Sequence, residues 1–205
     1  MNTFTKSALL GATMFTMVGA ANAESHAISA MSFGLDANAS IADNAMKVPT
    51  FSTLVAAVQA AGLADELMGD GDFTVFAPTD AAFAELPAGT VERLLAPGGE
   101  DGLMALVSAH VVPTSVASEY FQLAAIGNAD IALNNQTIEG VTGGLKMDTI
   151  GNTDVMVMKD NGSFYVMTDD QTTDNLREAA KIIETDIMSS NGVIHVIDQV
   201  LQPRN

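Results

Sequence analysis

Residues 190–198 (SNGVIHVID) place the strongest constraint on how this chain can fold. Four β-branched apolar residues in this segment favour a strand that is covered on both faces. Asn191 and Gly192 precede them and are typical of a tight turn, because glycine readily adopts positive φ and asparagine tolerates it. The apolar run is interrupted only by His195. The segment therefore predicts a turn followed by a buried strand that carries one histidine.

A second informative segment, residues 73–83 (FTVFAPTDAAF), lies far upstream. Its first five residues have the composition of a short strand, and Pro78 ends that strand. Either Thr79 or Asp80 is suited to cap a helix over 81–86, because both side chains can accept hydrogen bonds from the first free backbone N–H groups. A strand that runs directly into a capped helix is predicted here.

Periodicity and turn signals predict the remaining elements. Apolar spacing and caps predict helices at 41–47, 52–61, 89–95, 103–108, 118–125 and a helical turn at 176–180. Alternation predicts strands at 130–133, 137–141, 154–159, 163–168, 181–188 and 193–201. The Asn161–Gly162 pair between two alternating runs is a strong hairpin signal. Helices come first and strands dominate the second half, so the fold class is α+β.

The N-terminus has the features of an export signal. Lys6 precedes an apolar stretch at 8–20, and Ala21-Asn22-Ala23 forms an A-x-A cleavage site. We expect a signal peptide at 1–23, a tail or linker at 24–39 and one domain at 40–203. The protein is then exported, to the periplasm or to the cell surface and exterior, with no membrane span in the mature chain. An uncleaved N-terminal anchor is the alternative.

Charge and cysteine content narrow the function further. The chain has a formal net charge of −17, which repels nucleic acid and anionic membranes and favours cations or basic partners. Solubility alone also accounts for such a charge. There is no cysteine, which removes disulfides, thiolate metal sites and cysteine nucleophiles.

Three ordered blocks together resemble the fasciclin (FAS1) domain in its bacterial type: residues 71–83, residues 110–113 (HVVP) and residues 186–198. The helix at 53–58 is also similar to the family's. The resemblance implies a wedge-like β-sandwich with helices packed along one side. It also implies adhesion or attachment as the role, with no cofactor and no catalysis. The residues that carry this structural motif are Phe73, Thr74, Phe76, Pro78, Thr79, Asp80, His110, Asn191, Gly192 and His195.

The chain departs from the family pattern in two places. The tyrosine that often precedes the histidine of the second block is Ala109 here, and residues 184–188 (ETDIM) are similar to an integrin-linked motif with Thr185 in place of proline. Integrin binding is therefore not carried over to this chain. Residues 142–175 are longer than the hairpins usual at this point of the family, so an extended hairpin insertion is predicted there, as a place for individual specificity.

The predicted hairpin supplies the candidate partner-binding residues. Met156 and Met158 share one strand face, and the partner strand adds aromatic and methionine side chains. The full candidate set is Met156, Met158, Phe164, Tyr165, Met167, Asp186 and Ile187. An apolar patch of this kind fits a protein partner or a lipophilic small molecule. Packing on the main sandwich is the simpler alternative, and a Cu(I) site on the thioethers is a weaker one.

Other chemistry is weakly supported. His110 and His195 could share a metal or acid–base site, but their apolar neighbours favour buried, hydrogen-bonded histidines. The acidic segments at 70–72 and 169–174 could bind Ca²⁺, although neither follows the EF-hand pattern and solvated loops are the simpler interpretation. No G-x-S-x-G elbow and no phosphate-binding glycine motif is present, so a hydrolase is unsupported.

The sequence thus predicts a non-enzymatic adhesion or interaction module without cofactor or metal. Its expected partner is a protein or polysaccharide of the envelope or matrix, with weak self-association as a further possibility. The alternative is a periplasmic carrier for an apolar small molecule, in which the methionine-rich hairpin acts as a lid.

Overall fold

The computed structural model describes residues 34–69, 71–96, 98–127, 131–133, 136–141, 144–168 and 179–202. These residues form one sheet of nine strands in the order β2-β1-β9-β8-β7-β6-β5-β4-β3. The strands are β1 (Phe73–Pro78), β2 (Val111–Val112), β3 (Ile131–Leu133), β4 (Gln136–Val141), β5 (Gly144–Asp148), β6 (Asp154–Asp160), β7 (Ser163–Thr168), β8 (Ala180–Ser189) and β9 (Gly192–Ile197). The fold is α+β, as the sequence predicts.

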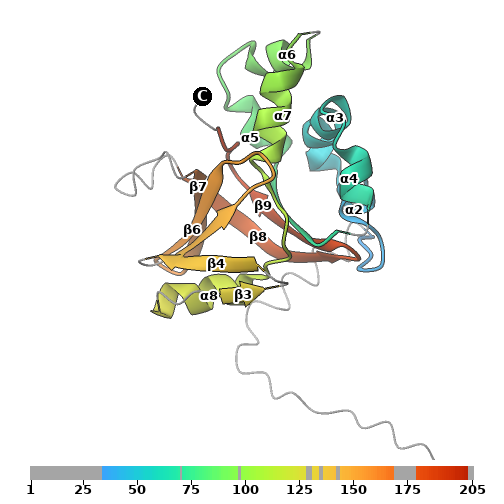
Figure 1. Cartoon of the computed structure of the whole chain (residues 1–205). Helices are drawn as coiled ribbons and strands as arrows, with labels where there is room; N and C mark the ends of the chain where they lie inside the picture. Colours follow the sequence, from blue (N-terminus) through green and yellow to red (C-terminus); the bar gives the residue numbers. More distant parts are fainter. Residues whose placement is uncertain are drawn as a thin grey trace, which may run out of the picture.

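The sheet curves so far that its two ends enclose a common core. One apolar cluster contains Phe76 of β1 and Val112 of β2 together with Leu145 of β5 and Val157 of β6. These strands lie on opposite sides of β8 in the strand order, so their side chains meet only because the sheet folds over. The result is a sandwich made from one continuous sheet (Figure 1). β1 and β9 are the parallel pair among the described strands, and the other neighbours are antiparallel.

Helices cover one side of the β1–β9–β8 end of the sheet (Figure 1). They are α2 (Ile41–Lys47), the 3₁₀ turn η1 (Pro49–Phe51), α3 (Ser52–Ala60), α4 (Ala64–Met68), α5 (Asp80–Ala84), α6 (Thr90–Leu95) and α7 (Glu100–Ser108). A second apolar cluster lies beneath them and includes Phe51, Leu54 and Val75. Helix α8 (Ser118–Gly127) lies at the other end of the molecule, against β4, β5 and β6. No helix among the described residues is long and apolar enough to cross a membrane.

The compact fold begins earlier than residue 40. Leu35 packs against the core beneath the helices, and the carbonyl of Ala39 accepts a hydrogen bond of 2.9 Å from the backbone N–H of Ser190. Asp36 pairs with the buried side chain of Asn44, as described below. Residues 34–39 therefore belong to the domain, which corrects the predicted tail at its C-terminal end. Helix α2 itself, capped by Ser40, has the predicted bounds.

The predicted hairpin at Asn161–Gly162 is confirmed, and it joins strands β6 and β7 of the sheet. The two turn residues have φ of 46° and 84°, the positive values that a type I′ turn needs. Strands β6 and β7 lie in the interior of the sheet, and the sequence did not predict β5 beside them. Val155, Val157 and Val166 are 1% exposed or less, so this segment carries core that the fold requires. In the folded chain both faces of β6 and β7 are covered. The alternation of apolar and polar residues alone does not reveal this.

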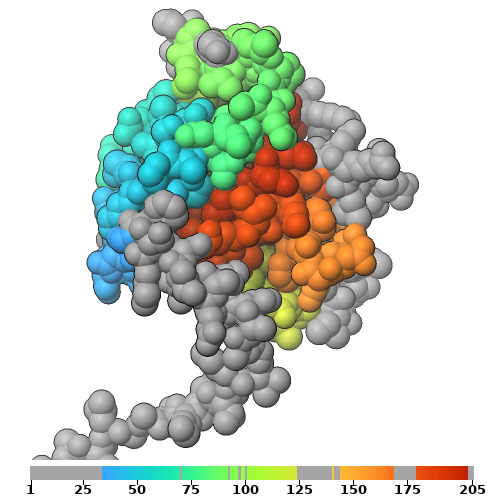
Figure 2. Space-filling view, turned by 180° about the vertical axis from the view of Figure 1, so that it is seen from behind, coloured from blue at the N-terminus to red at the C-terminus, as the bar shows by residue number. Residues whose placement is uncertain are grey.

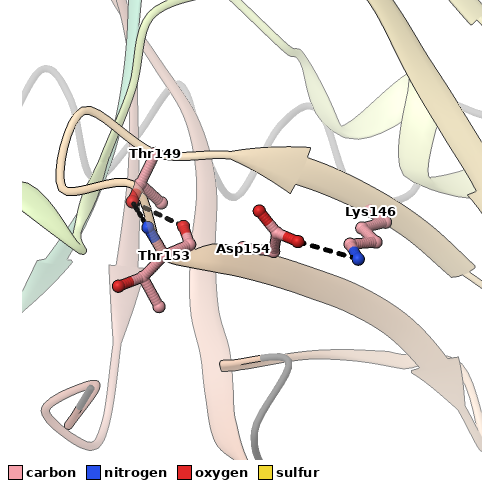
Figure 3. A network of polar contacts seen from close by, with 4 residues as sticks. All are labelled: Lys146, Thr149, Thr153 and Asp154. Carbon is pink, nitrogen blue, oxygen red and sulfur yellow. Dashed lines mark hydrogen bonds and ion pairs between the residues drawn. The ribbon is translucent and has the colours of Figure 1, made fainter. Parts of the chain in front are cut away.

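The β5–β6 connection is fixed by a small polar network (Figure 3). The Thr149 hydroxyl donates to the Thr153 carbonyl at 2.6 Å and accepts from the Thr153 N–H at 3.3 Å, which closes the turn. The ammonium of Lys146, in the middle of β5, and the carboxylate of Asp154, the first residue of β6, form an ion pair of 2.8 Å. The hydrogen bond from Lys146 holds the pKa of Asp154 below its ordinary value. The pair is partly exposed, so its contribution to stability is about 1 kcal/mol or less.

Two predicted elements differ in detail. The predicted strand at 193–201 ends at Ile197, because Asp198 turns back to accept a hydrogen bond of 2.7 Å from the Lys181 N–H. The predicted helical turn at 176–180 lies partly outside the described residues, and its last residue, Ala180, begins β8.

Candidate interaction surfaces

His110 is buried and both of its ring nitrogens have backbone partners. Nε2 accepts a hydrogen bond of 2.9 Å from the Leu201 N–H, so the proton must be on Nδ1, which donates to the Leu106 carbonyl at 2.7 Å. Only a neutral imidazole can make this pair of contacts. Burial lowers the pKa of His110 to about 4, with the bond to Leu106 opposing the shift in part. The histidine thus links α7 to the segment that follows β9.

His195 has the opposite tautomer. Its Nδ1 accepts from the Asp186 N–H at 3.3 Å, and its Nε2 donates to the Val116 carbonyl at 2.8 Å. The ring lies between Phe76 and Phe121, with ring centroids 5.8 and 5.0 Å away. The two histidines therefore occupy separate places in the core and bind different backbone groups. The geometry does not bring them into one metal or acid–base site.

Asn191 connects helices α2 and α4 through hydrogen bonds of its side chain. Its side-chain carbonyl accepts from the Ile41 N–H at 2.8 Å, while its amide donates to the carbonyls of Leu67 at 2.7 Å and Gly69 at 3.0 Å. One side chain therefore ties the start of α2 to the end of α4. Gly192 follows with φ of 141°, and a Cβ there would collide with the Phe73 backbone. This close approach explains why the turn requires glycine.

A second buried amide holds α2, and the sequence analysis did not find it. The Asn44 side chain is fully buried; it donates to the Asp36 carbonyl at 2.8 Å and to the Ser189 hydroxyl at 2.9 Å, and accepts from the Asp36 N–H at 3.0 Å. The sequence did contain a signal for it, a polar residue on the apolar face of the predicted helix. A buried amide almost always has hydrogen-bond partners, so this position indicates a polar contact in the core. Asn44 and Asn191 together fix α2 on the β8–β9 turn.

The other motif residues also act inside the fold. The Thr74 hydroxyl donates to the Thr114 carbonyl at 2.6 Å and accepts from the Val116 N–H at 2.8 Å. Thr79 caps α5 through the Ala82 N–H, which settles the choice between the two predicted caps. Asp80 accepts from the Ser52 hydroxyl and the Thr53 N–H, and these bonds lower its pKa against the opposing effect of burial. The remaining motif residues, Phe73, Phe76 and Pro78, are buried in β1.

The predicted apolar patch on the β6–β7 hairpin is mostly covered. Met156 lies opposite Met167 and Met158 opposite Tyr165, so these four side chains share one face as expected. However, Met167 is 1% exposed, and with Met156 it forms a small buried cluster with Ala179. Met156 and Met167 are therefore corrected to packing residues. Among the candidates on this hairpin, the half-buried Met158, Phe164 and Tyr165 remain at the surface.

Phe164 also has packing partners. Its ring meets that of Phe121 edge-on, with the centroids 5.7 Å apart, and the Lys159 ammonium lies 5.4 Å from its centroid. These contacts use much of the ring's apolar surface within the molecule. The hairpin is thus a weaker candidate for a binding surface than its composition suggests.

Asp186 and Ile187 are placed by an irregularity in β8. Asp186 has φ of 61°, an unusual value for a residue with a Cβ, at a register shift between Glu184 and Ile187. Its carboxylate accepts hydrogen bonds from the backbone N–H of Ser118, at 2.7 Å, and from the Ser118 hydroxyl, which anchors the start of α8. Ile187 is 6% exposed and faces the core. Ile187 is therefore corrected from a contact residue to a core residue.

No group of three or more His, Cys, Asp or Glu side chains comes together among the described residues in a way that would hold a metal ion. The predicted acidic segment at 169–174 and Asp70 lie outside the described residues.

An apolar groove between α2, α3 and α4 is the candidate surface that sequence reasoning missed. Its floor is buried, its walls are half-buried and its two rims end in the exposed side chains of Met46 and Met68. The cavity within it measures about 80 Å³. The lining comprises Ile41, Ala42, Ala45, Met46, Leu54, Val55, Val58, Gln59, Ala64, Leu67, Met68 and Val75. The sequence did contain a signal for this groove, because three consecutive short helices carry a wide apolar stripe. This stripe is wider than a single sheet face can cover.

Two further hollows are larger and differ in character. One, of about 250 Å³, is mainly apolar and lies where Leu35, Phe51 and the exposed Ile183 meet. The other, of about 280 Å³, is a shallow depression beside α5 with polar and apolar walls. None of these three hollows is lined by the β6–β7 hairpin, so the hairpin does not act as a lid over any of them.

Comparison with known proteins defines the class. The Fasciclin domain profile matches residues 49–203, and the chain belongs to the fasciclin domain family. It is 40% identical over 154 residues to Protein sll1483 of Synechocystis, an alignment that covers 75% of this chain and 68% of that protein. It is 34% identical over 155 residues to the pig transforming growth factor-beta-induced protein ig-h3, of which it spans 18%.

The solved structures give the same fold. The chain is similar to a FAS1 domain pair from the insect cell adhesion molecule Fasciclin I, with a TM-score of 0.59 and 13% identity. The match covers 80% of this chain and 51% of that one. At this identity the likeness establishes the fold and no more.

Proposed function

We propose that this protein is an exported, non-enzymatic adhesion module that binds a protein or polysaccharide of the cell envelope or matrix through surface complementarity. The observation that carries the proposal is the contrast between the polar motif residues and the exposed apolar side chains. The polar motif residues make hydrogen bonds inside the fold, whereas several large apolar side chains on the helices stand in solvent: Met46, Met68, Leu95, Met104 and Leu123. Met46 and Met68 border the same apolar groove, and exposed apolar side chains gathered in one place are typical of a contact surface.

The family relationship supports the same conclusion. A FAS1 domain pair of an insect cell adhesion molecule has this fold, and the acidic charge of −17 keeps copies of the chain apart while leaving them open to basic partners. Export is supported by the Lys6, apolar and A-x-A features of the first 23 residues.

A cell-attachment assay tests the proposal. The purified full chain is coated on a surface, and cells of its own host are allowed to settle and are washed under defined flow. We expect retention well above that on an equally acidic unrelated protein and on the same chain denatured before coating. Equal retention on all three surfaces would refute the proposed adhesion.

The carrier for an apolar small molecule is less well supported. The three hollows described above, of about 80, 250 and 280 Å³, are smaller than the roughly 300–1,000 Å³ usual for small-molecule sites. Native mass spectrometry of protein purified gently from its host separates the two functions. A mass excess that is lost on denaturation would favour the carrier, and a bare protein mass would favour adhesion.

A further inference from the structure

We propose that the groove between α2, α3 and α4 is the docking surface of this module, and that its occupant is a cationic amphipathic segment of a partner protein, which inserts apolar side chains between Met46 and Met68. This inference rests on the proposed adhesive function and names its binding surface and the chemistry of its partner.

The first argument is the graded burial across the groove. The floor is formed by buried side chains, among them Leu54 and Leu67, and the walls by half-buried ones, among them Val55 and Val58. The rims end in Met46 and Met68, which are 52% and 46% exposed. An inserted apolar side chain would therefore meet apolar atoms below and on both sides. Methionine suits such a rim, because its unbranched, polarisable side chain adapts to varied partners.

The second argument is the charge around the groove. Asp43 precedes Met46 by three residues on α2, and Asp65 precedes Met68 by three residues on α4, so each exposed methionine has a carboxylate as a neighbour on its own helix. Glu66 is also exposed, but its position on α4 is opposite to those of Ala64 and Met68, which line the groove. Lys47 is a cation at this end of α2. The hydrogen bonds from Asn38 hold the pKa of Asp36 below its ordinary value, and the attraction of Lys47 adds to this effect. Asp43 and Asp65 thus flank a groove whose own lining contains no charged residue.

The charge also selects the occupant. A second copy of this chain would bring another net charge of −17 to the surface, which opposes association in dilute salt. A polysaccharide lacks the apolar side chains that the centre of the groove would bury. A segment with apolar residues on one side and lysine or arginine on the other satisfies both the centre and the rim.

The third argument is that the groove is held in place from within. Asn191 hydrogen-bonds to both α2 and α4, and Asn44 fixes α2 to Ser189 at the end of β8. The two helices on either side of the groove are therefore attached to the same β8–β9 turn. A surface fixed in this way loses little conformational freedom when a partner binds. Figure 2 shows residues 34–68, in blue to cyan, as one continuous part of the surface beside the red and orange strands.

The test uses fluorescence anisotropy with a labelled 14-residue peptide of leucine and lysine arranged as an amphipathic helix. Two peptides serve as controls: the same composition scrambled so that no apolar face forms, and the same pattern with glutamate in place of lysine. We expect the full chain to bind the amphipathic cationic peptide at least about tenfold more tightly than either control, and this binding to weaken as salt is raised.

Matched variants locate the binding. The double variant Met46→Gln/Met68→Gln should weaken binding by about tenfold or more, because it removes apolar rim atoms without changing charge. The control Met104→Gln/Met188→Gln changes two methionines of similar exposure, 48% and 51%, outside the groove and should leave the affinity unchanged. Likewise, Asp43→Asn/Asp65→Asn should weaken binding and reduce its salt dependence, whereas Asp101→Asn/Glu119→Gln should not.

The outcomes separate this inference from the proposed function. Absence of binding, equal binding of the scrambled peptide, or equal losses in the groove and control variants would overturn the groove proposal. If host cells still attach to the coated protein in that case, the adhesive function stands and uses another surface. If the groove variants lose peptide binding and cell attachment together while the control variants keep both, the proposal is supported.

Discussion

Lowering the pH should destabilise this protein through His110. The folded protein holds this ring neutral, with a pKa of about 4 against an ordinary value of 6.5. Between these values the unfolded chain binds a proton that the folded chain does not, so the free energy of unfolding falls as the pH falls. The stabilisation is complete above pH 6.5 and is lost progressively down to about pH 4. Linkage gives a loss of about 1 kcal/mol by pH 5.5 and about 2–3 kcal/mol by pH 4.5.

The cause is geometric, which makes the prediction specific to this residue. A protonated ring would turn Nε2 from an acceptor into a donor that faces the Leu201 N–H, in a place where water cannot compensate. His110→Gln removes the titration and keeps a side chain that can accept and donate. The variant should be less stable than the wild type at pH 7.5, because its amide fits the two partners less well. Its stability should depend less on pH.

Urea unfolding followed by far-UV circular dichroism, at pH 7.5, 6.5, 5.5 and 4.5, measures both proteins. Carboxyl groups titrate in both, so the difference between the two curves isolates His110. We expect this difference in the free energy of unfolding to shrink by about 2–3 kcal/mol between pH 7.5 and 4.5. Parallel curves over this range would refute the argument that His110 is held neutral by burial and by its two backbone partners.

Three further substitutions test the internal hydrogen bonds and the turn. Asn191→Ala should cost about 3 kcal/mol or more, because it strands the Ile41 N–H and the Leu67 carbonyl, and hydrogen exchange should show faster opening of the Ile41 amide; unchanged exchange would contradict the tie between α2 and α4. Gly192→Ala should largely prevent folding. Gly162 is also at positive φ but has open space around it, so Gly162→Ala should cost only about 1–2 kcal/mol of unfolding free energy in a urea titration. Equal costs would show that the clash with the Phe73 backbone is not decisive. Asp186→Asn should cost about 1–2 kcal/mol of unfolding free energy, because asparagine tolerates the positive φ but loses the charge-assisted bonds to Ser118; an unchanged urea midpoint would argue against that anchor for α8.

The helices and turns were predicted well from the sequence, because caps and turn residues near their ends determine them. Ser40 caps α2, Gly62 has the positive φ of a helix end, and Asn161–Gly162 makes the predicted hairpin turn. Such signals depend on a few neighbouring residues, so the sequence displays them directly. The three-block resemblance then supplied the FAS1 fold, which the comparisons confirm.

The surfaces were predicted poorly, because exposure is a property of the whole fold. Met156 and Met167 have the composition of a binding patch, yet they pack against each other and Ala179. Met46 and Met68 have no special sequence context, yet they stand exposed on two helices that meet only in the folded chain. The alternating pattern of a strand does not reveal whether its second face is covered. The pattern of a short helix likewise does not reveal which of its apolar side chains remain exposed after folding.

The use of polar groups connects these observations to function. Asn44, Asn191, His110 and His195 are buried amides and imidazoles whose partners are mostly backbone groups at the ends of helices and strands. Such contacts hold short helices that have little stability of their own. With α2 and α4 fixed from within, their outer side chains need not stabilise the fold and are free to vary with the partner. This division of labour between internal polar groups and outer apolar ones is the basis for proposing a docking surface on the helices rather than on the β6–β7 hairpin.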